Sequence, residues 1–201
     1  MTGSLYILAT PIGNLRDITL RAVEILQKAD AVIAEDTRRA SVLLRHHGIR
    51  AKRLFSCHKF NEKSRTEKIL HLLLEGNDVA FISDSGTPGI SDPGQFIVKK
   101  AHERGIKVVA VPGASALTAA LSVAGVEDKG FTFIGFLGKK TKDIEEIKWL
   151  LETAGRPVVF YESPKRILKT LQKLSERLPE SVIILCRELT KIHEEVLRKT
   201  P

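Results

Sequence analysis

The sequence predicts an α/β fold built from two αβ domains, and three observations support this. Short β-branched runs alternate with segments of helical spacing from the first residues onward, which is typical of βα units that feed a parallel sheet. A chain of 201 residues has room for two small domains. A proline- and glycine-rich loop near residue 113 separates two such series. We therefore expect an N-terminal parallel-sheet domain over 1–112 and a C-terminal αβ domain over 113–201; one continuous sheet is the alternative.

In the first half, apolar runs predict strands over 5–9, 31–34, 54–56, 79–83 and 108–111. Ile18, Ala22 and Leu26 recur at helical spacing between the first two strands. Ser64 and Glu67 have the spacing of a capping box, and Gly76 is suited to the left-handed position that ends a helix. Right-handed crossovers would bring the carboxyl ends of these strands to one edge, where ligands bind in such sheets.

The second half begins with a helix of small residues after 112–116, followed by a turn over 125–130. Strands are expected over 131–136, 158–162 and 182–186, and helices over 144–151 and 164–178. Ser163 followed by Pro164 predicts an N-cap with proline at the first helical position. The residues after His193 are mostly charged, so we expect no closing element, and the second domain to lack an edge strand or a tail.

The net charge of +8 favours polyanionic partners, which include RNA, DNA and an anionic membrane; a solvated basic face without a partner is the alternative. Cys57 and Cys186 are too few for a disulfide framework or a four-ligand zinc site, and the six histidines show no metal spacing, so we expect no metal. No signal peptide or membrane-spanning run is evident. These features predict a cytoplasmic protein in a reducing environment.

Three glycine- or proline-rich loops follow predicted strands, at 10–14, 83–94 and 112–116. Glycine allows the backbone to approach a ligand closely, and free N–H groups at helix starts attract polar groups. We expect these loops to line one pocket. The sequence has no G-x-G-x-x-G fingerprint and no G-x-S-x-G elbow, and Phe136 stands where a phosphate loop needs lysine. Nicotinamide, flavin, P-loop and serine hydrolase chemistry are therefore disfavoured.

Charged segments also follow strands, at 35–39, 161–166 and 187–191. Asp36 has either a structural role as an N-cap or a functional one. The guanidinium groups of Arg38 and Arg39 suit phosphates. Each of these segments is alternatively a solvated charge run.

Together, these motifs are ATPIGNLRDITLRA, AEDTR, SDSGTPGISDPG, PGASA, GFLGKK, YESPKR and CRELTKIHEE. In order and spacing the series resembles the tetrapyrrole methylase type of methyltransferase, and within it the enzymes that use S-adenosylmethionine to methylate the 2'-hydroxyl of a cytidine ribose in 16S ribosomal RNA. The resemblance extends from Tyr6 to about Glu195. It implies two αβ domains with the cofactor in the cleft between them, and a homodimer. Lys165 departs from the family's YESPHR form, and the chain stops sooner than is usual, so contacts of a longer tail are not expected.

The resemblance also implies roles for individual residues. Residues expected to contact or shape the S-adenosyl-L-methionine site are Pro11, Gly13, Ser83, Asp84, Gly86, Thr87, Ser115, Ala116, Tyr161, Glu162 and Leu189. The 2'-hydroxyl needs a proton acceptor, for which Glu35, Asp36 and Glu162 are equal candidates. Cations expected to bind RNA phosphates are Arg16, Arg38, Arg39, Lys139, Lys140, Lys165 and Arg166.

The leading hypothesis is thus methylation of 16S rRNA in the small ribosomal subunit. Two alternatives stay open. The same fold can act on a tetrapyrrole or another small acceptor, and the basic surface alone can serve a non-catalytic RNA-binding module.

Overall fold

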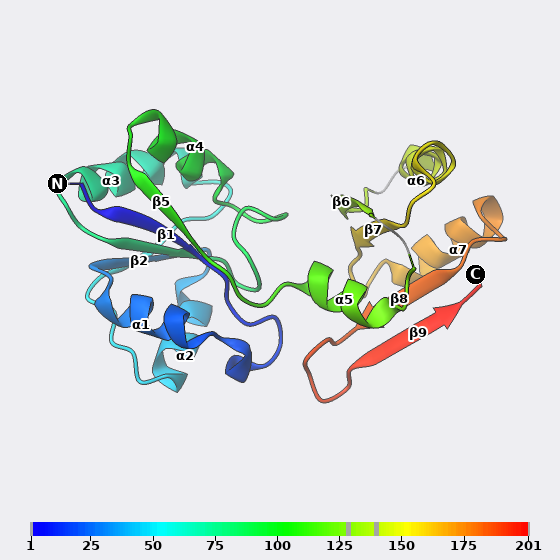
Figure 1. Ribbon diagram of the computed structural model, residues 1–201, viewed down its shortest axis with the longest axis horizontal. Coiled ribbons are helices and arrows are strands. Elements are labelled where there is room, and N and C mark those ends of the chain that lie inside the picture. The colour runs from blue at the N-terminus through cyan, green and yellow to red at the C-terminus, as the bar shows by residue number, and fades with distance from the viewer. Residues whose placement is uncertain (1, 128–129, 139–140, 201) are drawn as a thin grey trace. The chain divides into compact units, whose positions relative to one another are not determined.

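The computed structural model describes residues 2–127, 130–138 and 141–200 (Figure 1). The chain forms two compact units, Met1–Ala116 and Leu117–Pro201, which are described separately. The expected division lay after residue 112. The boundary between the two units is placed after Ala116, four residues further on, so the PGASA loop is counted with the N-terminal unit.

The N-terminal unit contains a five-stranded sheet in the order β3-β2-β4-β1-β5, with every neighbouring pair parallel. The strands are β1 (Ser4–Leu8), β2 (Ala31–Ala34), β3 (Leu54–Ser56), β4 (Val79–Ile82) and β5 (Lys107–Val111). All five strands were predicted, with ends that differ by one residue at most. The runs that form β2 and β4 are apolar throughout because both faces of these strands are buried.

Helices cover both faces of this sheet (Figure 1). They are α1 (Leu20–Lys28), α2 (Thr37–His46), α3 (Glu62–Leu74) and α4 (Gln95–Glu103), with a short 3-10 helix η1 (Leu15–Asp17) before α1. Ile33 packs in one core cluster with residues of α3 and α4, whereas its neighbour Val32 packs in the other with residues of α1 and α2. The alternation of side chains along β2 therefore divides the core into two layers.

Local signals set the helix starts. Thr19 caps α1 by accepting a hydrogen bond from the N–H of Ala22 at 3.1 Å. The predicted capping box of Ser64 and Glu67 is wrong, because the chain already turns at residues 58–61 and α3 begins at Glu62. The Ser64 hydroxyl donates to the carbonyl of Asn61 instead. Gly76, as predicted, adopts the left-handed conformation after α3, with φ of 90°.

The C-terminal unit begins with α5 (Ala116–Ala124), whose first residue is the last of the N-terminal unit. Its first sheet pairs β6 (Thr132–Phe136) with β7 (Val158–Tyr161) in parallel, and its helices are α6 (Thr141–Ala154) and α7 (Ile167–Arg177). Leu137, Ile144, Ile147 and Leu174 form its buried core.

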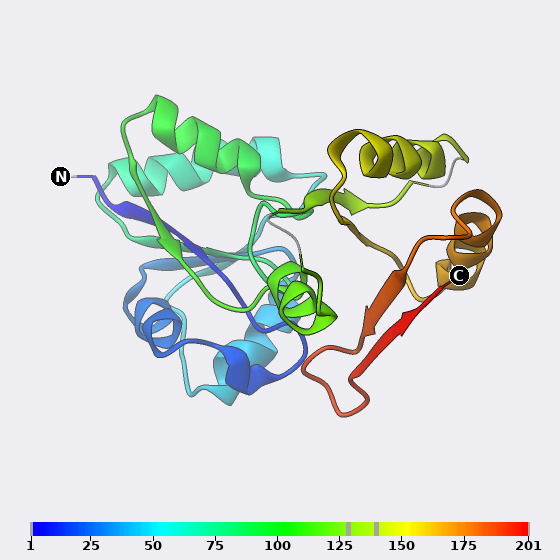
Figure 2. The ribbon, with the colours of Figure 1, turned by 45° about the vertical axis from the view of Figure 1, so that its right-hand side comes forward.

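Two expectations for this unit are wrong. The chain does close with a further strand, because β9 (Glu195–Lys199) pairs antiparallel with β8 (Ile183–Arg187) in a hairpin (Figure 2). Helix α7 starts at Ile167 and not at Pro164. Residues 164–166 form a turn in which the Ser163 carbonyl accepts from the N–H groups of Arg166 and Ile167. No helix within the described ranges is long and apolar enough to cross a bilayer.

Candidate functional site at the carboxyl edge of the parallel sheet

The carboxyl ends of the five parallel strands lie at one edge of the N-terminal sheet. The loops 10–14, 83–94 and 112–116 follow β1, β4 and β5, which are neighbours in the sheet order. The expectation that these loops share an edge is therefore confirmed. The charged segment 35–39 follows β2 and lies at the same edge.

The first two of these loops are joined by their backbones. Thr10 and Gly86 exchange two backbone hydrogen bonds, of 2.9 and 3.0 Å, in an isolated antiparallel bridge. The buried Ser83 hydroxyl donates to the Gly86 carbonyl at 3.0 Å. Gly86 has a φ of +80°, which favours glycine. Ser83 and Gly86, expected to contact the cofactor, thus use these polar groups to hold the loops together.

The third loop approaches the first at Gly113. A Cβ atom added there would lie 3.1 Å from the Cβ of Ala9 and 3.4 Å from the Ala9 carbonyl oxygen. The Ala9 N–H donates to Val111 at 3.1 Å just before the loop. The absence of a side chain at Gly113 therefore permits the close approach of these two segments.

Asp84 connects the ends of β4 and β2. Its Oδ1 atom accepts the backbone N–H of Asp36 at 2.9 Å, and its Oδ2 atom lies 3.6 Å from Nε of Arg39. One carboxylate thereby fixes the start of α2. Arg39, expected to bind RNA phosphate, faces this carboxylate.

A pocket of about 240 Å³ opens beside Asp84. Its lining comes from the first two loops, η1, β4 and α2, and consists of Thr10, Pro11, Leu15, Arg39, Ala40, Val42, Leu43, Ile82, Ser83 and Asp84. The expectation that all three loops line one pocket is wrong for this one, because residues 112–116 do not take part. Its volume is below the roughly 300–1,000 Å³ of small-molecule sites.

Three further carboxylates lie around this edge. Burial, and secondarily the charge of Asp84, raise the pKa of Glu35 and of Asp92. Neither carboxylate has a hydrogen bond or ion pair with a residue that the structure describes. Asp36 differs: hydrogen bonds from the Arg38 side chain and backbone lower its pKa to about 2. Its carboxylate caps α2, as the structural interpretation predicted, and binds the Arg38 guanidinium in a fork.

In the C-terminal unit, Tyr161 is the last residue of β7 and Glu162 follows it. The rings of Phe133 and Phe136 lie 5.0 and 5.3 Å from that of Tyr161, centroid to centroid. The Glu162 side chain is 4% exposed and its carboxylate is fully engaged. It accepts the Ser163 N–H at 2.6 Å and the Thr170 hydroxyl at 2.7 Å, and it pairs with Arg166.

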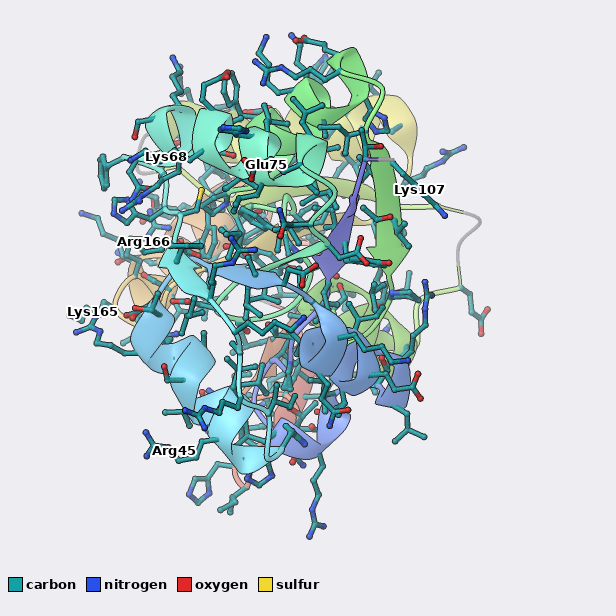
Figure 3. All side chains as sticks on the ribbon, turned by 90° about the vertical axis from the view of Figure 1, so that its left-hand side faces the viewer. Arg45, Lys68, Glu75, Lys107, Lys165 and Arg166 are labelled. Atoms are coloured by element: carbon teal, nitrogen blue, oxygen red, sulfur yellow. The ribbon has the colours of Figure 1, made fainter. Side chains whose placement is uncertain are left out.

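Arg166, just before α7, also donates to the Leu137 carbonyl at 2.9 Å, so its guanidinium joins the residues that directly follow β6 and β7. Lys165 beside it is exposed and extends from the ribbon (Figure 3). Lys165 and Arg16 form no ion pair with any described residue. Lys139 and Lys140 lie outside the described residues.

Leu189 lies in the turn between β8 and β9. Its neighbours Glu188 and Thr190 have φ of 52° and 66°, which is uncommon for residues other than glycine. The buried Thr190 hydroxyl has no hydrogen-bond partner in the described structure. Backbone strain of this kind concentrates at functional positions.

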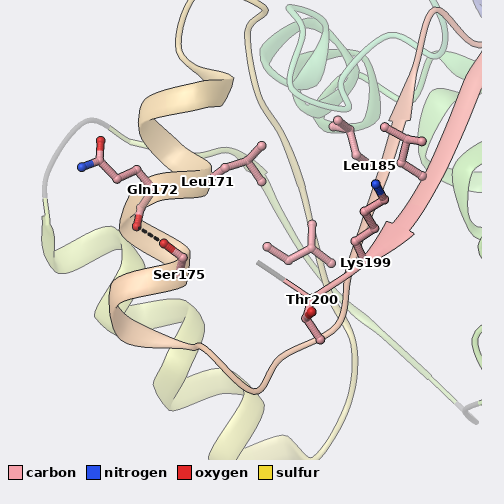
Figure 4. Close-up of a pocket in the computed structure, with 8 residues that line it drawn as sticks. Leu171, Gln172, Ser175, Leu185, Lys199 and Thr200 are labelled. Atoms are coloured by element: carbon pink, nitrogen blue, oxygen red, sulfur yellow. Dashed lines mark hydrogen bonds between the residues drawn. The ribbon is translucent and has the colours of Figure 1, made fainter.

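A second pocket, of about 340 Å³, lies between α7 and the β8–β9 hairpin (Figure 4). Its lining is mainly apolar and consists of Leu171, Gln172, Ser175, Ile183, Leu185, Leu197, Lys199 and Thr200. None of the sequence-predicted site residues lines it. In the described parts of the chain, no group of three histidine, cysteine or acidic residues is placed to hold a metal ion.

One segment at the carboxyl edge of the N-terminal sheet was not predicted from the sequence as part of a site. Lys59, Phe60 and Lys63 follow β3, and all three are exposed. The sequence signal was an aromatic residue among cations at the end of a strand.

Residues 4–200 match the family model of tetrapyrrole (corrin/porphyrin) methylases. The solved methyltransferase CobJ superimposes with a TM-score of 0.72 at 21% identity, over 99% of this chain and 87% of that one. Uroporphyrin III C-methyltransferase from Thermus thermophilus gives a TM-score of 0.66 at 18% identity, over 98% and 88% of the two chains. The chain belongs to the tetrapyrrole methylase family, and the predicted fold class is confirmed.

Within that family, the chain is similar to proteins named Ribosomal RNA small subunit methyltransferase I. The protein from Neisseria meningitidis serogroup B is 48% identical over 98% of this chain and 68% of its own length. The protein from Thermotoga maritima is 45% identical over 98% of this chain and 87% of its own length. The resemblance inferred from the motifs is thereby confirmed.

Proposed function

We propose that this chain transfers a methyl group from S-adenosylmethionine to the 2'-hydroxyl of a cytidine ribose in 16S rRNA of the small ribosomal subunit. The observation that carries the proposal is the identity of 45–48% with ribosomal RNA small subunit methyltransferases over 98% of the chain. The structural neighbours named cobalt precorrin-4 methyltransferase and uroporphyrin III C-methyltransferase are only 16% and 18% identical and share the fold.

The carboxyl edge of the N-terminal sheet suits a cationic cofactor. S-adenosylmethionine supplies an electrophilic methyl group on a positively charged sulfur. The carboxylates of Glu35 and Asp92 lie at this edge without partners among the described residues, and such groups favour a nearby cation.

The residues assigned to the cofactor divide into two groups. Pro11 and Asp84 line the pocket beside the joined loops and are assigned to direct contact, together with Gly13, Thr87, Ser115, Ala116, Tyr161 and Leu189. Ser83 and Gly86 are assigned to loop shape, since each uses its polar groups within the loops. Holding the acceptor in line with the methyl group supplies much of the rate enhancement in such a displacement.

Of the three candidate bases, Glu35 is the best placed to accept the 2'-hydroxyl proton. Asp36 caps α2 and binds Arg38, and Glu162 is occupied by Ser163, Thr170 and Arg166. Both would have to lose structural contacts to act. The raised pKa of Glu35 also makes its carboxylate a stronger base than an ordinary glutamate.

RNA contacts are assigned to cations that have no ion-pair partner among the described residues. Arg16 and Lys165 meet this condition, whereas Arg38, Arg39 and Arg166 face carboxylates of their own unit. We propose the latter three as positioning residues, and a contribution from Lys139 and Lys140 stays a prediction.

The test is methyl transfer from labelled S-adenosylmethionine to isolated small ribosomal subunits, followed by digestion to nucleosides. Label in 2'-O-methylcytidine supports the proposal. Label confined to a base, or transfer to a uroporphyrinogen in preference to RNA, contradicts it. A basic module without catalysis would show no heat of cofactor binding in calorimetry. The proposal includes a cytoplasmic location and a homodimer, and sedimentation equilibrium of the purified chain checks the latter.

A further inference from the structure

The segment between β3 and α3 presents an aromatic ring to solvent. Phe60 is 93% exposed. Burying this ring against a partner would remove a large apolar surface from water. Phe60 is the fourth residue after β3, which places it at the carboxyl edge that carries the proposed methyl-transfer site.

The backbone around Phe60 forms a hydrogen-bonded turn. Asn61 closes this turn by accepting the His58 N–H at 2.7 Å through its side chain, and its own N–H donates to the His58 carbonyl at 2.9 Å. The His58 ring meets the Phe60 ring edge-on, with centroids 6.2 Å apart. These hydrogen bonds fix the backbone that carries Phe60 before any partner arrives, which lowers the entropic cost of binding.

The turn is connected to the second glycine-rich loop. Glu62, the first residue of α3, accepts the N–H of Gly94 at 2.9 Å through its side chain. Gly94 ends the SDSGTPGISDPG segment. The hydrogen bond between Glu62 and Gly94 thereby connects the turn that carries Phe60 to the loop that follows β4.

The charge around the ring is positive. Lys59, Lys63, Arg65 and Lys68 belong to the turn or to the first two turns of α3, and Figure 3 labels Lys68. None of the four forms an ion pair with a described residue. The acidic residues of this stretch are engaged, since Glu67 pairs with Arg104 at 2.7 Å and Glu62 binds Gly94.

We propose that Phe60 is a stacking platform for an unpaired base of the RNA substrate, with Lys59 and Lys63 holding the adjacent phosphates. An aromatic face among unpaired cations is the combination that single-stranded RNA recognises, because every base offers a flat π face and every linkage a negative charge. A second protein copy would gain nothing from the cations, since this chain is itself basic. The proposal rests on the proposed RNA substrate and adds to it the contact that selects an unpaired segment.

The experiment uses the full chain and a single-stranded oligocytidylate of about eight nucleotides, which matches the site size of such surfaces. Phe60→Ala and Phe60→Leu are expected to weaken binding about tenfold, and Phe60→Trp to preserve it. Trp149→Ala removes an exposed aromatic residue elsewhere and is expected to leave binding unchanged. The slope of log K against log salt should stay the same in Phe60→Ala and fall by about 0.7 in Lys59→Ala or Lys63→Ala.

A spectroscopic arm tests stacking directly. Trp149 is the one tryptophan of the sequence, so Phe60→Trp in a Trp149→Phe background reports residue 60 alone. Quenching of its fluorescence by the oligonucleotide supports stacking, and unchanged fluorescence at saturation overturns it. Wild-type affinity of Phe60→Ala, or loss of self-association in that variant without loss of RNA binding, also overturns the proposal.

The two proposals fail separately. If small subunits are methylated normally by Phe60→Ala with an unchanged KM, the stacking proposal fails and the methyltransferase stands. If the wild-type chain binds oligonucleotide through Phe60 but methylates no RNA, the proposed activity fails and the stacking surface stands.

Discussion

The carboxylate of Asp84 binds the backbone N–H of Asp36 at 2.9 Å, across the ends of two neighbouring strands. The sequence positions are 48 residues apart, yet this contact fixes the start of α2 beside the pocket. Asp84 therefore has two separable properties, an acceptor oxygen that orients α2 and a negative charge that suits a cationic cofactor.

Substitutions at Asp84 separate these properties. Asp84→Asn keeps an acceptor for Asp36 but loses the charge, so we expect S-adenosylmethionine affinity to fall about tenfold with little change in stability. Asp84→Ala loses both and should also cost about 1–3 kcal/mol of unfolding free energy. Calorimetry and urea denaturation measure the two effects, with the exposed neighbour variant Ser85→Ala as control. Equal stability of the Asn and Ala variants would contradict this division.

Glu35→Gln tests the proposed base. Without a proton acceptor, kcat should fall about a hundredfold while the KM for RNA changes little. In the wild type, kcat should rise with pH as Glu35 ionises and then level off, and the variant should lose this limb. Glu24→Gln, on the exposed face of α1, is the matched control. A wild-type pH profile in Glu35→Gln would rule out Glu35.

The same substitution has a predicted effect on stability. Burial raises the pKa of Glu35 above its ordinary value of 4.5, so the folded state holds this proton more tightly than the unfolded state does. Stability therefore falls as the pH rises from about 4.5 through the raised pKa, because the ionised carboxylate is disfavoured in the fold. Glu35→Gln lacks this cost and should have a higher Tm at pH 7, with no advantage below pH 4 or so. Melting curves across this range provide the measurement.

Gly113→Ala tests the close approach of the first and third loops. Its Cβ would meet the Cβ of Ala9 at 3.1 Å, so one loop must shift and cofactor affinity should drop severalfold. Ala9→Gly removes the opposing atom, and the double variant should recover most of the affinity. Failure of the second substitution to rescue the first would mean that the contact with Ala9 is not the cause.

Neighbouring cations 165 and 166 are expected to behave differently. Arg166→Ala leaves the buried Glu162 carboxylate without its counterion and should destabilise the C-terminal unit by about 2–4 kcal/mol. Lys165→Ala should change stability by less than about 0.5 kcal/mol and reduce the salt slope of RNA binding by about one phosphate contact. Denaturation and salt titrations compare the pair. A larger salt effect for Arg166 than for Lys165 would reverse the assignment.

The sequence predicted best those elements that local pattern determines. The strands β2 and β4 are continuous apolar runs and were predicted in place. The strand β9 was missed because Glu195, Arg198 and Lys199 give it the composition of a solvated tail, and its partner β8 supplies the pairing. The start of α3 was misplaced because Asn61 closes a turn three residues before the predicted Ser64 cap.

The candidate site residues also divide into those that local pattern predicts and those that depend on partners distant in sequence. The edge that carries Glu35 and Asp84 was predictable, since parallel strands place their carboxyl ends together. Which carboxylate is free was not, because the answer depends on partners such as Arg38 for Asp36 and Thr170 for Glu162. Phe60 was not predicted as a site residue although it stands among cations in the sequence, because its exposure appears only in the folded chain.

The reciprocal bridge of Thr10 and Gly86 is made by main-chain atoms. The bridge therefore does not depend on the chemistry of most surrounding side chains. Substitutions at neighbours such as Ile12 or Ser85 are expected to leave the shape of the two loops unchanged. Under the proposed function, this bridge would hold the cofactor loops in place whatever the acceptor, so that a change of substrate would need substitutions in the surrounding side chains and not in the bridge itself.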